Sequence, residues 1–363
     1  MNRNDRRQLA KILGASAMAS LAMTPAVMAA PAIVRSEILR PSDQDVARFD
    51  PVLGTMFSPG FIGGGPVGAA GTPWTARAAA DVRLWQGVCY GNGTYVAVGN
   101  GSNNPVMTST TGTSWSSSSA PDGKNWWSVC YGGGLYVAAA QSTGTNNIMT
   151  SSTGASSSWT QQTTPSGSAN EYPNSVCYGN GTYVVVTGGG GVYTSTDGTT
   201  WTSRTPAAAN QWRGVCYGGG LFVAVSDNGS NRVMTSPDGT TWTSRSAAAS
   251  NAWYSVCYGN GLYVAVSNTG TGNRVMTSPD GTTWTSQTST ENNNWMSVCF
   301  GNNLFVAVAG NGTNRVMTSP NGSTWTARAA SEANGWNSVC YGDTPMLFAA
   351  VANSGTNRVM TAP

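Results

Sequence analysis

The chain of 363 residues contains 46 glycines, 17 prolines, 14 tryptophans and 13 tyrosines, and only 9% of its residues are charged. Its formal net charge of +3 is too small for the basic surface that nucleic-acid binding requires. Histidine is absent, which excludes the commonest general base, histidine-assisted nucleophiles and most zinc sites. The composition therefore favours one large all-β unit with no cofactor, no metal and no nucleic-acid partner.

Residues 1–29 have the charge pattern of an export signal. A positively charged start precedes an uncharged stretch from Ile12 to Val34, and a candidate cleavage site lies just before Ala30. The pair Arg6-Arg7 resembles the twin arginines of one class of export signal. The alternative is an uncleaved hydrophobic anchor, because the uncharged stretch is about long enough to span a bilayer.

Residues 30–70 are interpreted as an arm. Proline, glycine and single apolar residues alternate there without a period, as they do between Phe57 and Pro66. This composition is typical of a linker or of a segment that docks on another protein.

Residues 71–363 contain seven copies of a repeat of about forty residues. Each copy has one cysteine in the same phrase, a Gly or Ser, a Val, the Cys and an aromatic residue: Cys89, Cys130, Cys177, Cys216, Cys257, Cys299 and Cys340. A period of this length, in a sequence rich in β-branched and aromatic residues, is typical of a propeller. We therefore expect an all-β fold, a seven-bladed β-propeller of four-stranded blades.

The copy that begins at Trp253 shows the expected blade. Its pattern predicts four strands over 253–258, 262–267, 274–278 and 283–286. The first two are joined by Gly259-Asn260-Gly261, which tolerates the positive φ of a tight hairpin turn. The second strand is almost continuously apolar, as expected when neighbouring blades cover both of its faces.

The ring is predicted to close through its N-terminal strand. Seven cysteines are followed by only six strand-four tryptophans, and the last copy ends after its third strand, at Pro363. The segment Gly71–Arg77 matches Gly322–Arg328, which includes a strand-four tryptophan. The strand around Trp74 should therefore complete the blade that begins near Cys340, so that no open edge remains.

The cysteines are predicted to be buried, inert thiols packed between blades. Their number is odd, and equivalent points on adjacent blades should lie beyond the roughly 7 Å Cα separation that a disulfide allows. No Cys-x-x-Cys pair is present to bind a metal.

One phrase in the repeat resembles a known family. The sequence Thr-Ser-Pro-Asp-Gly-Thr-Thr-Trp at 235–242 and 277–284 resembles the Asp-box (BNR-like) repeat of sialidase-type and sortilin-type propellers. The whole repeat is similar to repeats of bacterial surface proteins and of phage tail or fibre proteins. In the Asp-box family this phrase is a structural turn between strands three and four, so the resemblance implies a propeller and not an activity. Thr111, Thr153 and Asn321 replace the aspartate in three copies.

The resemblance also implies an enzymatic alternative, a sialidase-like glycoside hydrolase. Such a site requires three arginines that converge on a carboxylate, together with a tyrosine nucleophile paired with a glutamate and an acid. Here the arginines of successive repeats are expected to lie around the ring instead. No pair of carboxylates at the separation that glycoside hydrolysis requires stands out from the repeat pattern. We expect a protein without enzymatic activity.

The sequence favours recognition of surface carbohydrate at a rim of loops. Aromatic faces stack on sugar rings, and amides and guanidinium groups bind hydroxyls. Repetition would give several weak sites whose avidity multiplies. The predicted ligand-binding residues are six tryptophans that precede the cysteines and four arginines at the ends of loops: Trp85, Trp126, Trp212, Trp253, Trp295, Trp336, Arg232, Arg274, Arg315 and Arg358. The opposing interpretation is that these tryptophans only pack the blades together.

The expected partners are surface glycans or a glycan-bearing receptor. A structural alternative is a virion or envelope component whose propeller docks on other proteins through residues 30–70. Either role places the protein outside the cytoplasm, in the periplasm, on the cell surface, in the medium or on a virion.

Overall fold

The computed structural model describes residues 48–50, 55–57, 73–101, 104–142, 144–165 and 171–363. The chain divides into Met1–Gln44 and Asp45–Pro363, and all described residues lie in the second unit. The predicted export signal and most of the predicted arm therefore lie outside the described residues. Within the arm, β1 (Arg48–Asp50) pairs antiparallel with β2 (Thr55–Phe57), a short hairpin that the sequence did not predict.

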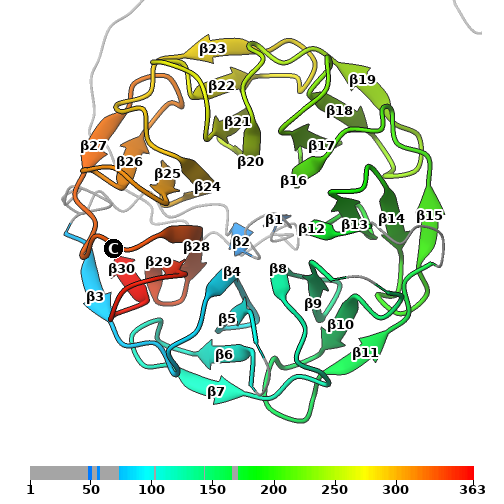
Figure 1. Cartoon of the computed structure of the whole chain (residues 1–363), viewed down its shortest axis with the longest axis vertical. Helices are drawn as coiled ribbons and strands as arrows, with labels where there is room; N and C mark the ends of the chain where they lie inside the picture. The colour runs from blue at the N-terminus through cyan, green and yellow to red at the C-terminus, as the bar shows by residue number, and fades with distance from the viewer. Residues whose placement is uncertain (1–47, 51–54, 58–72, 102–103, 143, 166–170) are drawn as a thin grey trace, which may run out of the picture. The chain divides into compact units, whose positions relative to one another are not determined.

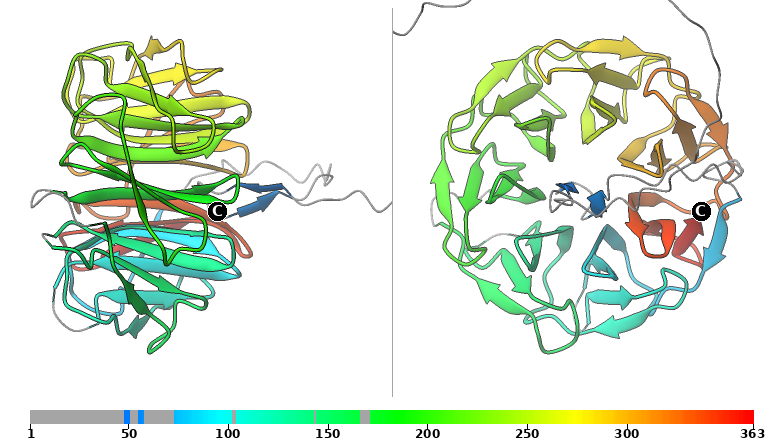
Figure 2. Two further views of the ribbon diagram at one scale, coloured as in Figure 1. Left: turned by 90° about the vertical axis from the view of Figure 1, so that its right-hand side faces the viewer. Right: turned by 180° about the vertical axis from the view of Figure 1, so that it is seen from behind.

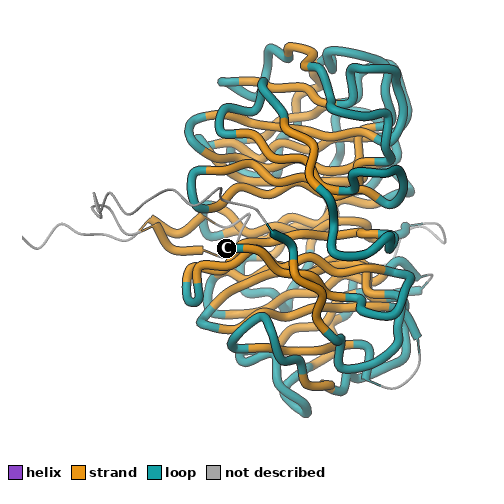
Figure 3. Tube along the Cα trace, turned by 90° about the vertical axis from the view of Figure 1, so that its left-hand side faces the viewer, coloured by secondary structure: helices purple, strands orange, loops and turns teal. Residues whose placement is uncertain are grey.

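Seven four-stranded antiparallel sheets stand around a central axis (Figure 1). In every sheet the first strand lies nearest the axis and the fourth lies on the perimeter. The strands cross the thickness of the ring and the connections gather at its two ends (Figures 2 and 3). The structure confirms the predicted seven-bladed propeller with four-stranded blades.

The two inner strands of each blade form its core. The first strands are β4 (Trp85–Gly91), β8 (Trp126–Gly132), β12 (Pro173–Gly179), β16 (Trp212–Gly218), β20 (Trp253–Gly259), β24 (Trp295–Gly301) and β28 (Trp336–Asp343). The second strands are β5 (Thr94–Gly99), β9 (Leu135–Ala140), β13 (Thr182–Thr187), β17 (Leu221–Ser226), β21 (Leu262–Ser267), β25 (Leu304–Ala309) and β29 (Met346–Ala352). All but the first one or two residues of each second strand are buried, as predicted for a strand covered on both faces.

The two outer strands are shorter. The third strands are β6 (Val106–Ser109), β10 (Ile148–Ser151), β14 (Val192–Ser195), β18 (Val233–Ser236), β22 (Val275–Ser278), β26 (Val316–Ser319) and β30 (Val359–Ala362). The fourth strands are β7 (Ser116–Ser118), β11 (Thr160–Gln162), β15 (Thr202–Arg204), β19 (Thr243–Arg245), β23 (Thr285–Gln287), β27 (Thr326–Arg328) and β3 (Thr75–Arg77). Their solvent-side residues are small and polar, which suits a perimeter exposed to water.

The ring has two chemically different ends. At the turn end, tight turns join the first strand to the second and the third to the fourth; Asn260 and Gly261 adopt φ of 50° and 75° in one of them, as predicted. At the loop end lie the connections from the second to the third strand and the segments that cross to the next blade. The loop end is therefore where backbone length and sequence can vary.

Adjacent blades meet through an aromatic ring that lies on a glycine. A Cβ atom added to Gly91 would lie 2.2 Å from the ring of Tyr131, and one added to Gly259 would lie 2.1 Å from that of Phe300. Tyr136 also donates its hydroxyl proton to the carbonyl oxygen of Gly91. Only glycine allows this approach, so the Gly two residues after each first-strand Cys is fixed by the packing of the next blade.

The N-terminal strand closes the ring as predicted. Strand β3 pairs antiparallel with β30, with Ala76 opposite Met360. Trp74 is 7% exposed, and its ring centroid lies 6.5 Å from that of Phe348 in the same blade. Arg77 Nε donates to Thr361 Oγ1 at 3.1 Å. The seventh blade is thus built from both ends of the repeat region.

Aspartates organise the turns between the third and fourth strands. Asp197 Oδ1 accepts hydrogen bonds from the backbone nitrogens of Thr199 at 2.8 Å and Thr200 at 2.7 Å. These N–H groups hold the pKa of Asp197 well below its usual range. Asn321 makes the same two backbone contacts without a charge, at 3.1 and 2.9 Å. The carboxylate is therefore a local turn element, as its sequence context predicted.

Loss of the closing strand should destabilise the whole ring. Trp74→Ala removes a buried indole, a change that typically costs about 3–5 kcal/mol, and should lower the melting temperature by roughly 5–10 °C. Deletion of residues 71–80 should lower it further. The control is Val82→Ala, because Val82 is 75% exposed. An unchanged melting curve for the deletion would show that ring closure contributes nothing.

Acid should weaken the fold through the three aspartate turns. Hydrogen bonds lower the pKa of Asp197, Asp238 and Asp280 in the folded protein, so their stabilisation is complete above the unfolded value of about 3.9 and is lost as the pH falls below it. The triple Asp→Asn variant copies the uncharged turn of Asn321. Its melting temperature should fall less than that of the unmodified protein between about pH 4 and pH 2. Equal acid sensitivity would contradict this assignment.

Candidate functional site

The six predicted tryptophans are core residues. Each has an exposed fraction of 0%, so none can present a ring face to a ligand. Five of the six indoles donate to the carbonyl oxygen four residues earlier, in the crossing segment; Trp253 donates to Ala249 at 3.0 Å and Trp336 to Glu332 at 3.1 Å. This burial contradicts the prediction that the six rings stack on sugars: Trp85, Trp126, Trp212, Trp253, Trp295 and Trp336.

The four predicted arginines hold the backbone of the loop end. Arg274 donates to the carbonyl oxygens of Gly270 at 2.8 Å and Asn268 at 2.8 Å in its own loop, and to that of Asn293 at 2.7 Å before the next blade. Arg315 likewise reaches its own loop and the segment before β28. All four arginines donate to carbonyl oxygens of the loops: Arg232, Arg274, Arg315 and Arg358. They therefore have a structural role that the ligand hypothesis did not predict.

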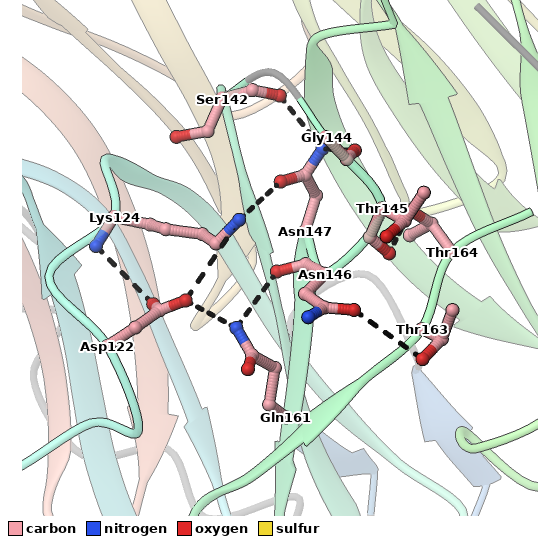
Figure 4. A network of polar contacts seen from close by, with 10 residues as sticks. All are labelled: Asp122, Lys124, Ser142, Gly144, Thr145, Asn146, Asn147, Gln161, Thr163 and Thr164. Atoms are coloured by element: carbon pink, nitrogen blue, oxygen red, sulfur yellow. Dashed lines mark hydrogen bonds and ion pairs between the residues drawn. The ribbon is translucent and has the colours of Figure 1, made fainter. Parts of the chain in front are cut away.

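The second blade fastens its loop with other side chains (Figure 4). Asn147 occupies the position of the arginine, directly before the third strand, and donates to the carbonyl oxygen of Gly144 at 2.7 Å. Lys124 Nζ donates to Asn147 Oδ1 at 3.0 Å, and Gln161 donates to Asp122. An amide and a lysine thus fix the loop of this blade, as an arginine does in four other blades. This supports loop fixation as the role of the residue directly before the third strand.

A cavity of about 150 Å³ lies on the axis, and we call this space the channel. Three successive positions of every first strand line it. Nearest the cysteines is a collar of seven valines with exposed fractions of 4–7%. A ring of glycines and serines comes next, and Ser338 Oγ there accepts the backbone N–H of Val88 in the adjoining blade at 3.2 Å. The third ring, which we call the mouth, consists of Gln86, Trp127, Asn174, Arg213, Tyr254, Met296 and Asn337.

The mouth is the variable position of a nearly invariant strand. In the seven copies it holds six residue types, whereas the Val and Cys that follow do not vary and the second residue after the Cys is always Gly. Every first strand also has a β-bulge here; the register in β20 shifts between Trp253 and Ser255, around Tyr254. A bulge redirects a side chain from the sheet. Packing therefore leaves this position free to vary, and the bulge directs it to the channel.

Polar contacts hold one half of the mouth in place. Asn337 Nδ2 donates to Gln86 Oε1 at 2.7 Å across the seam between the seventh and first blades. Asn174 Oδ1 accepts from Gln141 Nε2 at 2.8 Å. These amides are thus oriented before any ligand arrives.

The other half carries aromatic and charged groups. Arg213 Nε lies 2.6 Å from Asp227 Oδ2, and the guanidinium carbon lies 5.3 Å from the ring centroid of Tyr254. Trp127, Tyr254 and Met296 are half-buried. The mouth thus offers an aromatic and apolar surface beside fixed hydrogen-bonding groups.

The thiols that line the inner channel are poorly suited to nucleophilic chemistry. Burial raises the pKa of Cys89, Cys299 and Cys340, so these thiols stay protonated at neutral pH. The seven cysteines are buried, as predicted. The described residues contain no group of three or more acidic or cysteine side chains that could hold a metal ion. In the same part of the chain, no helix is long and apolar enough to cross a membrane.

Sequence reasoning missed the mouth because it favoured the repeated residues. A residue that recurs in every blade is required by every blade, and that requirement is usually packing. The signal that the sequence did contain was a variable position: one residue differs between the copies, whereas the rest of the phrase is nearly the same in all of them. Comparison of the seven phrases column by column would have found it.

Replacement of a predicted tryptophan should damage the fold. Trp253→Ala leaves a cavity in a fully buried site and should destabilise the protein by about 3–5 kcal/mol in denaturant unfolding. Trp253→Phe should lose less, because it keeps most of the ring. If Trp253→Ala instead retained the stability of the unmodified protein, the core role of this residue would be wrong.

Comparison with known proteins supports the fold and names the family. The chain resembles virginiamycin B lyase from Staphylococcus aureus (TM-score 0.67, 10% identity, covering 80% of this chain and 98% of that one) and YCF48 bound to D1 peptide (0.62, 16%, 80% and 94%). It also resembles the WD40 beta propeller domain of Doa1 (0.60, 13%, 80% and 97%). At these identities the likeness shows the fold alone. No curated protein matches the sequence. The DUF6242 beta propeller domain matches residues 124–212 and 204–335, more than half of the chain, and the chain therefore belongs to that family.

Proposed function

We propose that this propeller is a non-enzymatic binding protein that recognises surface carbohydrate at the mouth of its axial channel. One observation carries the proposal: the position that varies between otherwise similar blades is the one that faces the channel. Variation confined to a single ring is expected where seven blades contribute different contacts to one ligand. The binding site is then one per chain, in place of the several rim sites that the sequence suggested.

The chemistry of the mouth suits a sugar. Trp127 and Tyr254 supply aromatic rings for stacking, and Gln86, Asn174 and Asn337 supply amides for hydroxyl groups. The contacts of these amides with neighbouring blades fix their orientation, which lowers the entropy lost on binding. A cavity of about 150 Å³ accommodates the end of a glycan chain, and not an extended segment of it.

The same groups favour binding over catalysis. The single acid that contacts a mouth residue in the described structure, Asp227, is paired with Arg213. Glycoside hydrolysis needs two carboxylates about 5–9.5 Å apart. Here the carboxylate of Asp227 is paired with the guanidinium of Arg213. Such a pair can position a ligand, but it does not supply the proton donor and the nucleophile that hydrolysis needs.

An exported or virion-displayed location fits this role. The charge pattern of residues 1–29 and the resemblance of the repeat to those of bacterial surface proteins and phage tail proteins support it. Residues 30–70 would then connect the propeller to a surface or a particle, and the protein would serve as its glycan-recognising head.

The full-length protein on a glycan array, with Trp127→Ala beside it, tests the proposal. Loss of one stacking ring should weaken binding about five- to tenfold and leave the melting temperature nearly unchanged. Leu84→Ala is the control, since Leu84 is 45% exposed and does not line the channel. The proposal fails if no glycan binds, if Trp127→Ala binds as well as the unmodified protein, or if only peptides compete for the mouth.

A further inference from the structure

The mouth carries no net charge. Arg213 is the one charged residue among the described residues that line the channel. Its Nε lies 2.6 Å from Asp227 Oδ2, and both side chains are mostly shielded, with exposed fractions of 21% and 13%. Arg232, in the same blade, is turned to the carbonyl oxygens of Asp227 and Gly229. The positive charge at the mouth is therefore already balanced before a ligand binds.

Asp227 stands behind the mouth, at the residue that follows the second strand. The equivalent residues of two other blades reach mouth residues: Gln141 donates to Asn174 and Asn353 donates to Asn337, at 2.8 and 3.2 Å. Asp227 holds Arg213 in the same way. This second layer fixes the orientation of the mouth.

The second layer also contains acceptors without donors. One side-chain oxygen in each of three equivalent residues is buried and has no hydrogen-bond partner in the described structure: Asn100, Asp227 and Asn268. Buried acceptors of this kind require donors from a ligand or from water. Asp227 belongs to the blade of Arg213, and Asn268 belongs to the next blade, which also contains Tyr254. Behind this part of the mouth, the second layer therefore has acceptors to spare.

We propose that the mouth selects uncharged, hydroxyl-rich sugars and rejects sugars that carry a carboxylate, such as sialic and uronic acids. The inference rests on the proposed function and defines its ligand class. The buried oxygens of Asp227 and Asn268 add acceptors, and no donor, to the layer behind the mouth. A carboxylate supplies no donor, faces Asp227 with a like charge, and must break the pair of Arg213 and Asp227 to gain a cation. The ion pair is thus the element that excludes acidic ligands.

Binding of matched neutral and sialylated oligosaccharides to the full-length protein tests the inference. The unmodified protein should bind the neutral series at least tenfold more tightly. Asp227→Asn keeps the shape but leaves the charge of Arg213 unbalanced, so it should shift the ratio toward the sialylated series by about tenfold. Asp227→Glu keeps the charge and should keep the neutral preference.

The matched control is Asp122→Asn. Asp122 lies 4.0 Å from Lys124 at the same end of the ring but does not line the channel, so its loss should leave the ratio unchanged. If the protein binds neutral and sialylated oligosaccharides equally well and Trp127→Ala abolishes this binding, the inference is wrong and the proposed function stands. An unchanged ratio in Asp227→Asn would also overturn it. Absence of all glycan binding would remove both proposals.

Discussion

The contact between an aromatic ring and a glycine on the neighbouring blade is the constraint on which the architecture depends. A Cβ atom on Gly132, Gly179 or Gly218 would lie 2.1–2.3 Å from the ring of the next blade, so the second residue after each first-strand Cys must be glycine. The valine collar and the buried cysteines of the same strand are fixed by their own neighbours. These contacts recur around the ring, and they leave one position of each first strand without a packing partner that is the same in every blade. The seven residues at that position form the mouth.

This division explains how an almost identical repeat can build one asymmetric site. Six residue types occupy the mouth because its side chains point to the axis, where packing does not dictate their shape. The loop end is fixed separately, by arginines in four blades and by the Lys124 and Asn147 network in the second. In the proposed function, these loop contacts and oriented amides would reduce the entropy that binding must overcome. The propeller fold by itself does not specify the residues of this ring.

The predictions from sequence succeeded where the repeat itself was the signal. Seven blades, the four strands of the copy at Trp253 to within two residues, the buried cysteines and the closing role of Trp74 all follow from periodicity and from one missing strand. The tryptophan site failed for a related reason. A recurring tryptophan in a repeat protein can be a ligand platform or a blade wedge, and spacing alone does not distinguish them. Its indole donates to a carbonyl oxygen only four residues earlier, a local contact that the sequence does not display.

The sequence by itself determined the number of blades, their strand order and the closure of the ring, because these depend on local patterning repeated at a fixed period. The tertiary structure alone decided which side chains face the axis, since a β-bulge redirects one residue per strand and alternation alone does not reveal it. It also decided which charges are balanced. Arg213 and Asp227 are fourteen residues apart in the chain and meet only because the first and second strands of their blade lie side by side.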